Sequence, residues 1–456
     1  MNFSLFGQNL VTFLAMIFAA LVVYFAALPW LRSDKKRKGQ KKRTPKFVLP
    51  RRKLTTLIGV AFVFALSVQV AAALLFPGEE LPILFWMALP LSVAATTIIW
   101  SWAFATRWFD RTFAVLLVVS SLLLGVAMLN DYYHYYPTLA DAFGKTPAQR
   151  IGGRTDQTVV RYSTNKASAQ AVPLEQTVQN IGTLPLNGEV YKLSVPATAS
   201  HFAARDGWLY VPPIAFSPEK VDLPVIVLLA GEPGSPNDWL NGGGAKQTLN
   251  AFAAEHHGVT PIVAMVDDLG SQFNDTECVD SSHGNAETYL TVDVPNYLKA
   301  NFDVSTTPND WAIGGLSDGG MCGAMLALRH PNTFHYFLDL GGTSGPNVGS
   351  QIATIADLFH GSQEDFNEHE PLYLLQHGSW KSSGLGGYFA VGSSDSTDIV
   401  SAVQALYHQS AASGLSVAEE TTEGRHTFAV WQQQFHDALP WLSYHLGATA
   451  CTGQCY

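Results

Sequence analysis

Charge is scarce in this 456-residue chain, because only 14% of its residues are Asp, Glu, Lys or Arg, against about a quarter in an average soluble protein. The sign of the charge differs between two parts of the chain: residues 1–130 hold 14 basic and 4 acidic residues, whereas residues 131–456 hold 13 basic and 33 acidic ones. Such a split excludes a single soluble domain. It also argues against nucleic acid as a partner, since phosphates would repel an acidic globule.

The common zinc-binding motifs are absent as well. The chain has four cysteines and contains no HExxH or CxxC motif. Zinc sites in proteins are usually built from such motifs. We therefore expect neither a metal nor another cofactor.

Long apolar runs, in contrast, are plentiful before residue 130. Four of them come near the ~20 residues that an α-helix needs to cross ~30 Å of hydrocarbon. They are Leu5–Leu31, Leu54–Phe76, Leu81–Ala105 and Thr112–Leu129. We expect residues 1–130 to form a four-span transmembrane helical bundle that acts as an anchor.

The loops between these runs predict the orientation of the bundle. Residues 32–53 carry 12 Lys and Arg against one acid, and the positive-inside tendency places them in the cytoplasm. Three further crossings bring everything after residue 130 to the extracytoplasmic side of the cell membrane. There, residues 131–181 would form an aromatic juxtamembrane segment and linker, residues 182–447 a catalytic domain, and residues 448–456 a tail.

After the linker, short β-rich runs alternate with helical patterns. Apolar strands such as PVIVLL and PIVAMV are typical of a parallel sheet that is covered on both faces. The alternation predicts an α/β three-layer sandwich. We expect strands at 189–194, 208–211, 224–229, 261–266, 310–314, 336–340, 388–391 and 416–421, and helices at 292–301, 319–330, 398–413 and 427–446.

A G-x-S-x-G motif, Gly315-Leu316-Ser317-Asp318-Gly319, lies between an expected strand and an expected helix. A serine on such a sharp turn has strained backbone angles, and side chains two residues away on either side would collide, which explains the glycines. The turn lifts the hydroxyl out of the sheet edge, with a helix N-terminus behind it to favour developing negative charge. Ser317 is therefore the predicted nucleophile.

A serine hydroxyl needs a base, and the base needs an acid that orients it. In the order Ser, then acid, then His, both partners should follow Ser317 at strand ends. His426, between the last expected strand and the last expected helix, is the predicted base. Asp395, just past a strand, is the preferred acid, and Asp398 at the start of the next helix remains the alternative.

The oxyanion of an acyl-transfer reaction needs two backbone N–H donors. One is expected from Asp318, directly after the nucleophile. The other is expected from Glu232, in the loop LLAGEPGSPNDW that follows an early strand. Pro233 has no N–H and cannot serve.

The segments LLAGEPGSPNDW, GGLSDGGMCGAMLALRHP and EGRHTFAVW resemble the esterase-D-like branch of the α/β hydrolases, which includes enterochelin esterases, feruloyl esterases and mycolyltransferases. The resemblance covers residues 182–446 and implies an α/β-hydrolase fold with Ser317, Asp395 and His426 as the triad. The chain departs from the mycolyltransferases at the acid, where they use a glutamate and this sequence reads GSSD. That departure favours hydrolysis over transfer.

All four cysteines fall on the side of the membrane that is expected to be oxidising, which suggests disulfides. Four cysteines allow three pairings. Cys451 and Cys455 are close enough to pair locally, which would leave Cys278 with Cys322.

Together these features predict a membrane-anchored serine esterase that acts on an acyl or aminoacyl ester, with a membrane lipid among the candidate substrates. One alternative is an acyltransferase that uses the same acyl-enzyme and moves acyl groups between cell-envelope molecules. Another is a non-catalytic envelope protein. Residues 343–387, an insertion between two strands, are expected to form a lid or a substrate wall.

Overall fold

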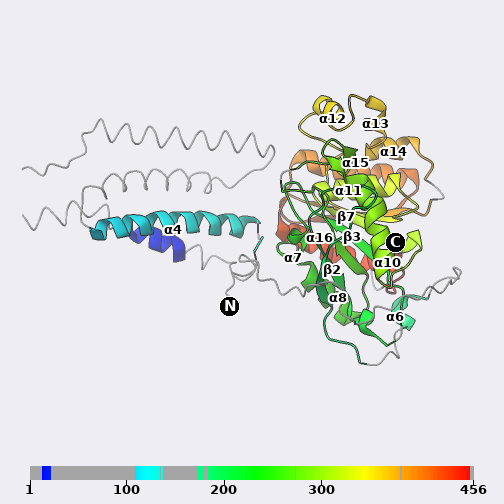
Figure 1. Cartoon of the computed structure of the whole chain (residues 1–456), viewed down its shortest axis with the longest axis horizontal. Helices are drawn as coiled ribbons and strands as arrows, with labels where there is room; N and C mark the ends of the chain where they lie inside the picture. Colours follow the sequence, from blue (N-terminus) through cyan, green and yellow to red (C-terminus); the bar gives the residue numbers. More distant parts are fainter. Residues whose placement is uncertain are drawn as a thin grey trace, which may run out of the picture. The chain divides into compact units, whose positions relative to one another are not determined.

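The computed structural model divides the chain into two compact units, residues Met1–Gly144 and Lys145–Tyr456, which Figure 1 colours from blue to red along the sequence. The residues that the structure describes are 13–21, 108–133, 135–136, 172–177, 183–218, 220–272, 274–380 and 383–451.

In the first unit, the described residues are helical at 13–21 and in α4 (Trp108–Tyr133). No helix among the described ranges combines the length and the hydropathy that a membrane crossing requires. The predicted span Thr112–Leu129 falls within α4 and gains no support there. The first predicted span is described only at residues 13–21, and the second and third lie outside the described residues.

An eight-stranded sheet forms the centre of the second unit, in the order β1-β2-β4-β3-β7-β8-β9-β10. Strand β2 pairs antiparallel with β1 and β4, and the remaining neighbours are parallel. The sequence predicts all eight strands to within two residues. They are β1 (Glu189–Leu193), β2 (Gly207–Val211), β3 (Val225–Leu229), β4 (Ile262–Met265), β7 (Trp311–Leu316), β8 (Tyr336–Leu340), β9 (Gly386–Gly392) and β10 (Ser416–Thr422).

Strand β3 is apolar at every position because both of its faces are buried. Val225, Val227 and Leu229 enter one hydrophobic core, while Ile226 and Leu228 enter the other. Helices α10 (Val294–Asn301), α11 (Asp318–Arg329) and α15 (Thr397–Ser413) contribute to the first core, and α8 (Ala245–Glu255) and α16 (Phe428–His445) to the second. Figure 1 shows these helices around the sheet. The predicted three-layer α/β arrangement is thereby confirmed.

Several short elements are absent from the sequence prediction because they carry too few residues for a periodic pattern. The insertion between β8 and β9 holds three short helices, and its predicted position between two strands is confirmed. The short elements are α6 (Leu174–Thr177), α7 (Asn237–Leu240), β5 (Asp280–Ser281), β6 (Gly284–Asn285), α9 (Ala286–Thr288), a π-helical turn (Tyr289–Asp293), 3₁₀ turns at Pro213–Phe216 and Pro308–Asp310, α12 (Gln351–Asp357), α13 (Gln363–Asn367) and α14 (Pro371–His377).

A disulfide joins Cys278, in the loop before β5, to Cys322 on α11. This confirms one of the expected pairs. Cys451 is disulfide-bonded as well, and its predicted partner Cys455 lies outside the described residues. Because both sulfurs of the first bridge are fully buried, the bridge fixes the loop around Cys278 against the helix that follows the expected nucleophile.

Candidate active site

The expected nucleophile occupies a strained turn. Ser317 lies between β7 and α11 with φ +54° and ψ −123°, a conformation that costs of order 1–3 kcal/mol and persists only where surrounding structure enforces it. Two flanking glycines make the turn possible. A Cβ on Gly315 would lie 2.3 Å from the carbonyl oxygen of Leu229, and one on Gly319 would lie 2.3 Å from that of Ala230.

His426 connects the other two expected members of the site. Its Nε2 lies 2.8 Å from Ser317 Oγ, and its Nδ1 lies 2.9 Å from Asp395 Oδ2. Since the side facing a carboxylate carries the ring proton, Nε2 is left free to accept the serine proton. The Trp431 indole packs edge-on against the imidazole, with 4.7 Å between ring centroids.

Asp395 is the carboxylate that reaches the histidine. It lies in the turn after β9, and its side chain is only 5% exposed. Its other oxygen, Oδ1, accepts a hydrogen bond from the backbone N–H of Ser396 at 2.8 Å. Asp398 lies one turn further on, in the first turn of α15 behind the N-cap Ser396. The structure therefore brings together Ser317, His426 and Asp395.

The two expected oxyanion donors lie beside the nucleophile. Asp318 is the first residue of α11. Glu232 follows Gly231, and a Cβ added to Gly231 would lie 3.1 Å from Ser317 Cβ. The absence of a side chain at Gly231 lets the loop after β3 approach the serine closely, and Glu232 is joined to Pro233 by a cis peptide bond.

Carboxylates crowd this side of the nucleophile. Burial raises the pKa of Asp318 to about 8, and the charges of Asp275 and Glu232 act in the same direction. Burial raises the pKa of Glu277 well above its usual value, assisted by the charges of Asp318 and Asp275. The sequence did not reveal that the carboxyl groups of Asp275 and Glu277 interact with that of Asp318. The acidic stretch DDLGSQFNDTECVD was a signal, but it lies some 40 positions before the serine in the chain.

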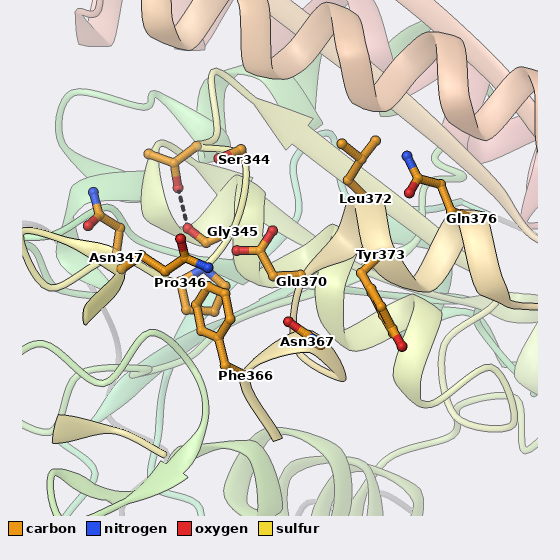
Figure 2. Close-up of a pocket in the computed structure, with 12 residues that line it drawn as sticks. Ser344, Gly345, Pro346, Asn347, Phe366, Asn367, Glu370, Leu372, Tyr373 and Gln376 are labelled. Carbon is orange, nitrogen blue, oxygen red and sulfur yellow. Dashed lines mark hydrogen bonds between the residues drawn. The ribbon is translucent and has the colours of Figure 1, made fainter. Parts of the chain in front are cut away.

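A pocket of about 470 Å³ lies in the insertion, and Figure 2 shows its walls. The first of its lining residues along the chain is Thr343, two positions after Gly341. A Cβ added to Gly341 would lie 3.4 Å from the His426 ring. Its lining contains one acid, Glu370, and no base. Burial raises the pKa of Glu370 to about 7. The lining residues are Thr343, Ser344, Gly345, Pro346, Asn347, Gln351, Phe366, Asn367, Glu370, Leu372, Tyr373 and Gln376.

One group among the described residues has metal-ligand spacing, namely Cys278, Asp318 and Cys322. The two sulfurs are bonded to each other, so neither is a thiolate that could bind a metal ion. The group therefore does not form a thiolate metal site.

A protein-family model described as "Putative esterase" matches residues 205–442. An uncharacterized protein of Corynebacterium glutamicum is 34% identical over 340 residues, which make up 73% of this chain and 76% of that protein. A stretch of 63 residues is 41% identical to the diacylglycerol acyltransferase/mycolyltransferase Ag85B of Mycolicibacterium smegmatis, covering 14% of this chain and 19% of that enzyme.

Two solved structures of hydrolases also align with part of this chain. A ferulic acid esterase aligns with a TM-score of 0.47 and 16% identity, over 57% of this chain and 99% of its own. An S-formylglutathione hydrolase from Agrobacterium tumefaciens aligns with a TM-score of 0.47 and 15% identity, over 58% of this chain and 98% of its own.

Proposed function

We propose that this chain, which belongs to the esterase family, hydrolyses a carboxylic ester through a Ser317-His426-Asp395 triad. One observation carries the proposal. The imidazole of His426 bridges the serine hydroxyl and the aspartate at 2.8 and 2.9 Å, which is the geometry that an activated nucleophile requires.

The reaction follows from these positions. Ser317 Oγ attacks the ester carbonyl carbon and passes its proton to His426 Nε2, and Asp395 stabilises the resulting imidazolium through Nδ1–H. The negative oxygen of the tetrahedral intermediate is held by the N–H groups of Glu232 and Asp318. As the intermediate collapses, the ester C–O bond breaks and the leaving alcohol takes the proton from Nε2. Water then repeats the sequence on the acyl-serine and releases the acid.

Acyl transfer is the second candidate function. The same acyl-serine would form, and a hydroxyl of another molecule would replace water in the second half of the reaction. The similarity of 63 residues to a mycolyltransferase supports this candidate. Product analysis with and without an added alcohol separates the two. A non-catalytic role is disfavoured by the hydrogen-bonded triad.

Replacing Asp395 by Asn is expected to lower kcat for 4-nitrophenyl acetate by about 10³–10⁴-fold, because an amide favours the wrong imidazole tautomer. The matched control is Asp398→Asn, which changes an acid on α15 that does not contact His426. Its kcat should match that of the unaltered enzyme. Loss of activity in Asp398→Asn together with full activity in Asp395→Asn would reverse the choice of acid.

We further propose that the apolar runs before residue 130 anchor the chain in the cell membrane, with the second unit on the extracytoplasmic side. The support comes from the sequence, namely the length of the runs and the basic loop at residues 32–53. Alkaline phosphatase fused after Tyr456 should be active, because this enzyme needs an oxidising compartment to form its disulfides. An inactive phosphatase, paired with a fluorescent cytoplasmic reporter at the same site, would refute the orientation.

A further inference from the structure

Glu287, on α9, brings together three basic side chains. Its Oε1 accepts a hydrogen bond from Arg329 Nε at 2.8 Å and lies 2.6 Å from His330 Nε2, while its Oε2 lies 3.0 Å from His369 Nε2. Arg329 and His330 stand at the end of α11, the helix that begins directly after Ser317, whereas His369 follows α13 in the insertion. One carboxylate therefore joins the nucleophile helix to the insertion.

The carboxyl group of Glu287 is ionised, although its side chain is only 10% exposed. Burial alone would raise its pKa, but hydrogen bonds with His330 and His369 and the charge of Arg329 lower that pKa below its usual value. Charge-assisted hydrogen bonds are shorter and stronger than those between neutral groups. Removing one member of such a group leaves charges without partners, which is costly. The four side chains therefore hold one another in place.

Further contacts hold the insertion at the same point. Arg329 Nη1 donates a hydrogen bond to the carbonyl oxygen of Glu368 at 2.5 Å, and His369 Nδ1 lies 2.6 Å from the carbonyl oxygen of Asp365. The ring of His369 also packs against that of Phe359, with 5.0 Å between their centroids. This part of the insertion is thus fixed from the side of α11 as well as from within.

The segment held in this way forms a wall of the pocket. Phe366 and Asn367, before the fixed residues, and Glu370, after them, belong to the pocket lining. Figure 2 draws all three, with the carboxyl group of Glu370 beside Gly345, where an added Cβ would lie 2.7 Å from Glu370 Oε1. We call residues 366–370 the anchored wall. Because no member of the triad belongs to it, a shift of this wall would reshape the pocket without altering the triad.

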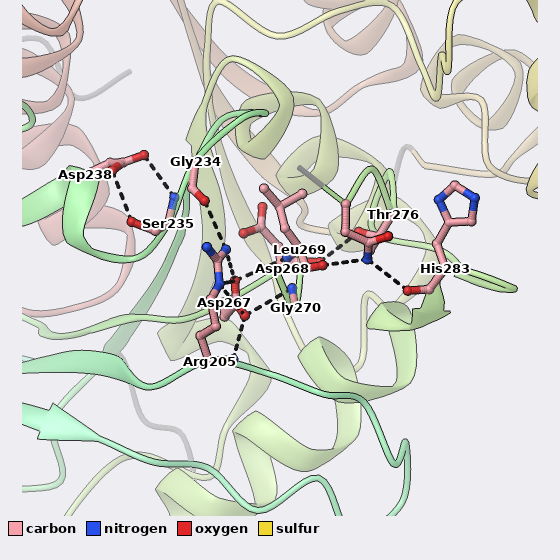
Figure 3. Close-up of polar contacts among 11 residues, drawn as sticks. Arg205, Gly234, Ser235, Asp238, Asp267, Asp268, Leu269, Gly270, Thr276 and His283 are labelled. Atoms are coloured by element: carbon pink, nitrogen blue, oxygen red, sulfur yellow. Dashed lines mark hydrogen bonds and ion pairs between the residues drawn. The ribbon is translucent and has the colours of Figure 1, made fainter. Parts of the chain in front are cut away.

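The loop that leads to Glu287 is fixed by its own hydrogen bonds. Thr276 Oγ1 donates to the carbonyl oxygen of Asp268 at 2.7 Å, and Asn274 Nδ2 donates to that of His283 at 2.9 Å, as Figure 3 shows. The buried disulfide ties the same loop to α11. Glu287 is therefore presented from a fixed part of the fold.

A second link joins this loop to the insertion, but it is weaker. His283 Nε2 lies 3.2 Å from Asp357 Oδ2 at the end of α12. The Asp357 side chain is 51% exposed, and ion pairs in contact with solvent contribute little because water screens them. The largely buried Glu287 is the link that decides the position of the anchored wall.

We propose, building on the esterase function above, that Glu287 is a positioning residue: it holds the anchored wall against the larger group of the ester and so sets the affinity for the substrate. The pocket lining supplies the rings of Phe366 and Tyr373 and contains no basic side chain. It therefore suits an uncharged group such as an aromatic ring, and it offers no partner to an anionic one. The three basic partners of Glu287 are not members of the triad, so its effect falls on binding and not on the chemical step.

The test measures kcat and KM for three esters on the purified full-length chain at pH 7. Benzyl acetate and methyl phenylacetate are isomers that place the same ring on the alcohol side or on the acyl side, and methyl acetate has no ring. For the unaltered enzyme, one of the two isomers should have a KM about tenfold or more below that of methyl acetate, as burial of an aromatic ring predicts. Glu287→Gln should raise that KM by about tenfold and leave kcat and the KM for methyl acetate within about twofold, as expected when only ground-state binding is lost.

His369→Gln breaks the same link from the insertion side and leaves the other partners of Glu287 in place. It should raise the same KM to a similar extent, and the double variant should show no further rise, because both changes remove one interaction. His369→Gln also keeps the test valid if Glu287→Gln fails to fold. The matched controls Glu364→Gln and His436→Gln alter exposed side chains and should leave the kinetics of all three esters unchanged.

Three results would overturn this inference alone. They are KM values of both ring-bearing esters equal to that of methyl acetate in the unaltered enzyme, an unchanged KM in both folded variants, and an equal loss of kcat for all three esters in a folded Glu287→Gln variant. Absence of Ser317-dependent hydrolysis of any of the three esters would overturn the esterase function and the inference with it.

Discussion

Ser317→Ala is expected to lower kcat for 4-nitrophenyl acetate by about 10⁴-fold or more, which is the scale of loss when a triad nucleophile is removed. The reason is geometric. Ser317 Oγ is the atom that His426 Nε2 contacts at 2.8 Å, and without it no covalent acyl-enzyme forms. The measurement is steady-state kinetics on the purified full chain, together with mass spectrometry of the protein after treatment with a fluorophosphonate.

The unaltered enzyme should gain one phosphonyl group on Ser317, and the variant none. Ser394→Ala is the matched control, because Ser394 is an exposed serine in the turn after β9, and it should keep full activity and full labelling. An alanine variant at 317 with more than a tenth of the original kcat would remove the triad from the proposal.

Gly319→Ala is expected to have the largest effect on folding. The new Cβ would lie 2.3 Å from the carbonyl oxygen of Ala230 and 2.7 Å from that of Leu229. Both contacts are with backbone at the end of the buried strand β3, which cannot swing aside as a flexible side chain would. We expect a loss of about 3 kcal/mol in the free energy of unfolding and a melting temperature lower by roughly 10 °C.

Relieving this clash requires α11 to move away from β3. Because Ser317 lies between β7 and α11, activity should fall along with stability. Gly349→Ala separates steric clash from backbone strain, since Gly349 has φ +107° and nothing within 4 Å of an added Cβ. Its cost should be about 1–2 kcal/mol, with kcat unchanged. Scanning fluorimetry on both variants checks the contrast, and equal melting temperatures for Gly319→Ala and the unaltered chain would contradict it.

The candidate triad illustrates how far local sequence signals extend. Gly315, Ser317 and Gly319 stand in one short motif whose backbone strain demands glycines, so the turn was predictable. His426 and Asp395 were predictable because parallel strands end at the same edge of a sheet, and each residue follows such a strand. The choice between Asp395 and Asp398 was harder, since two acids three residues apart both suit a strand-to-helix loop. The hydrogen bond to His426 distinguishes them.

The grouping of Asp275 and Glu277 with Asp318 was not predictable in this way. Asp275 and Glu277 lie in a loop without strand or helix periodicity, and nothing in their local pattern points toward Ser317. Their approach to Asp318 depends on the bridge between Cys278 and Cys322 and on the hydrogen bond of Thr276. The insertion is a second example. The sequence predicted its position between β8 and β9, but it did not predict the pocket inside it.

The sequence by itself determined the eight strands, the strained serine turn and the order of the catalytic candidates, because hydrophobic periodicity and glycine sterics act over a few neighbouring residues. Only the tertiary structure decided which aspartate meets the histidine and that four carboxylates gather beside the nucleophile. Electrostatic coupling depends on distance in space, and that distance is fixed by packing and cross-links between segments that lie far apart along the chain.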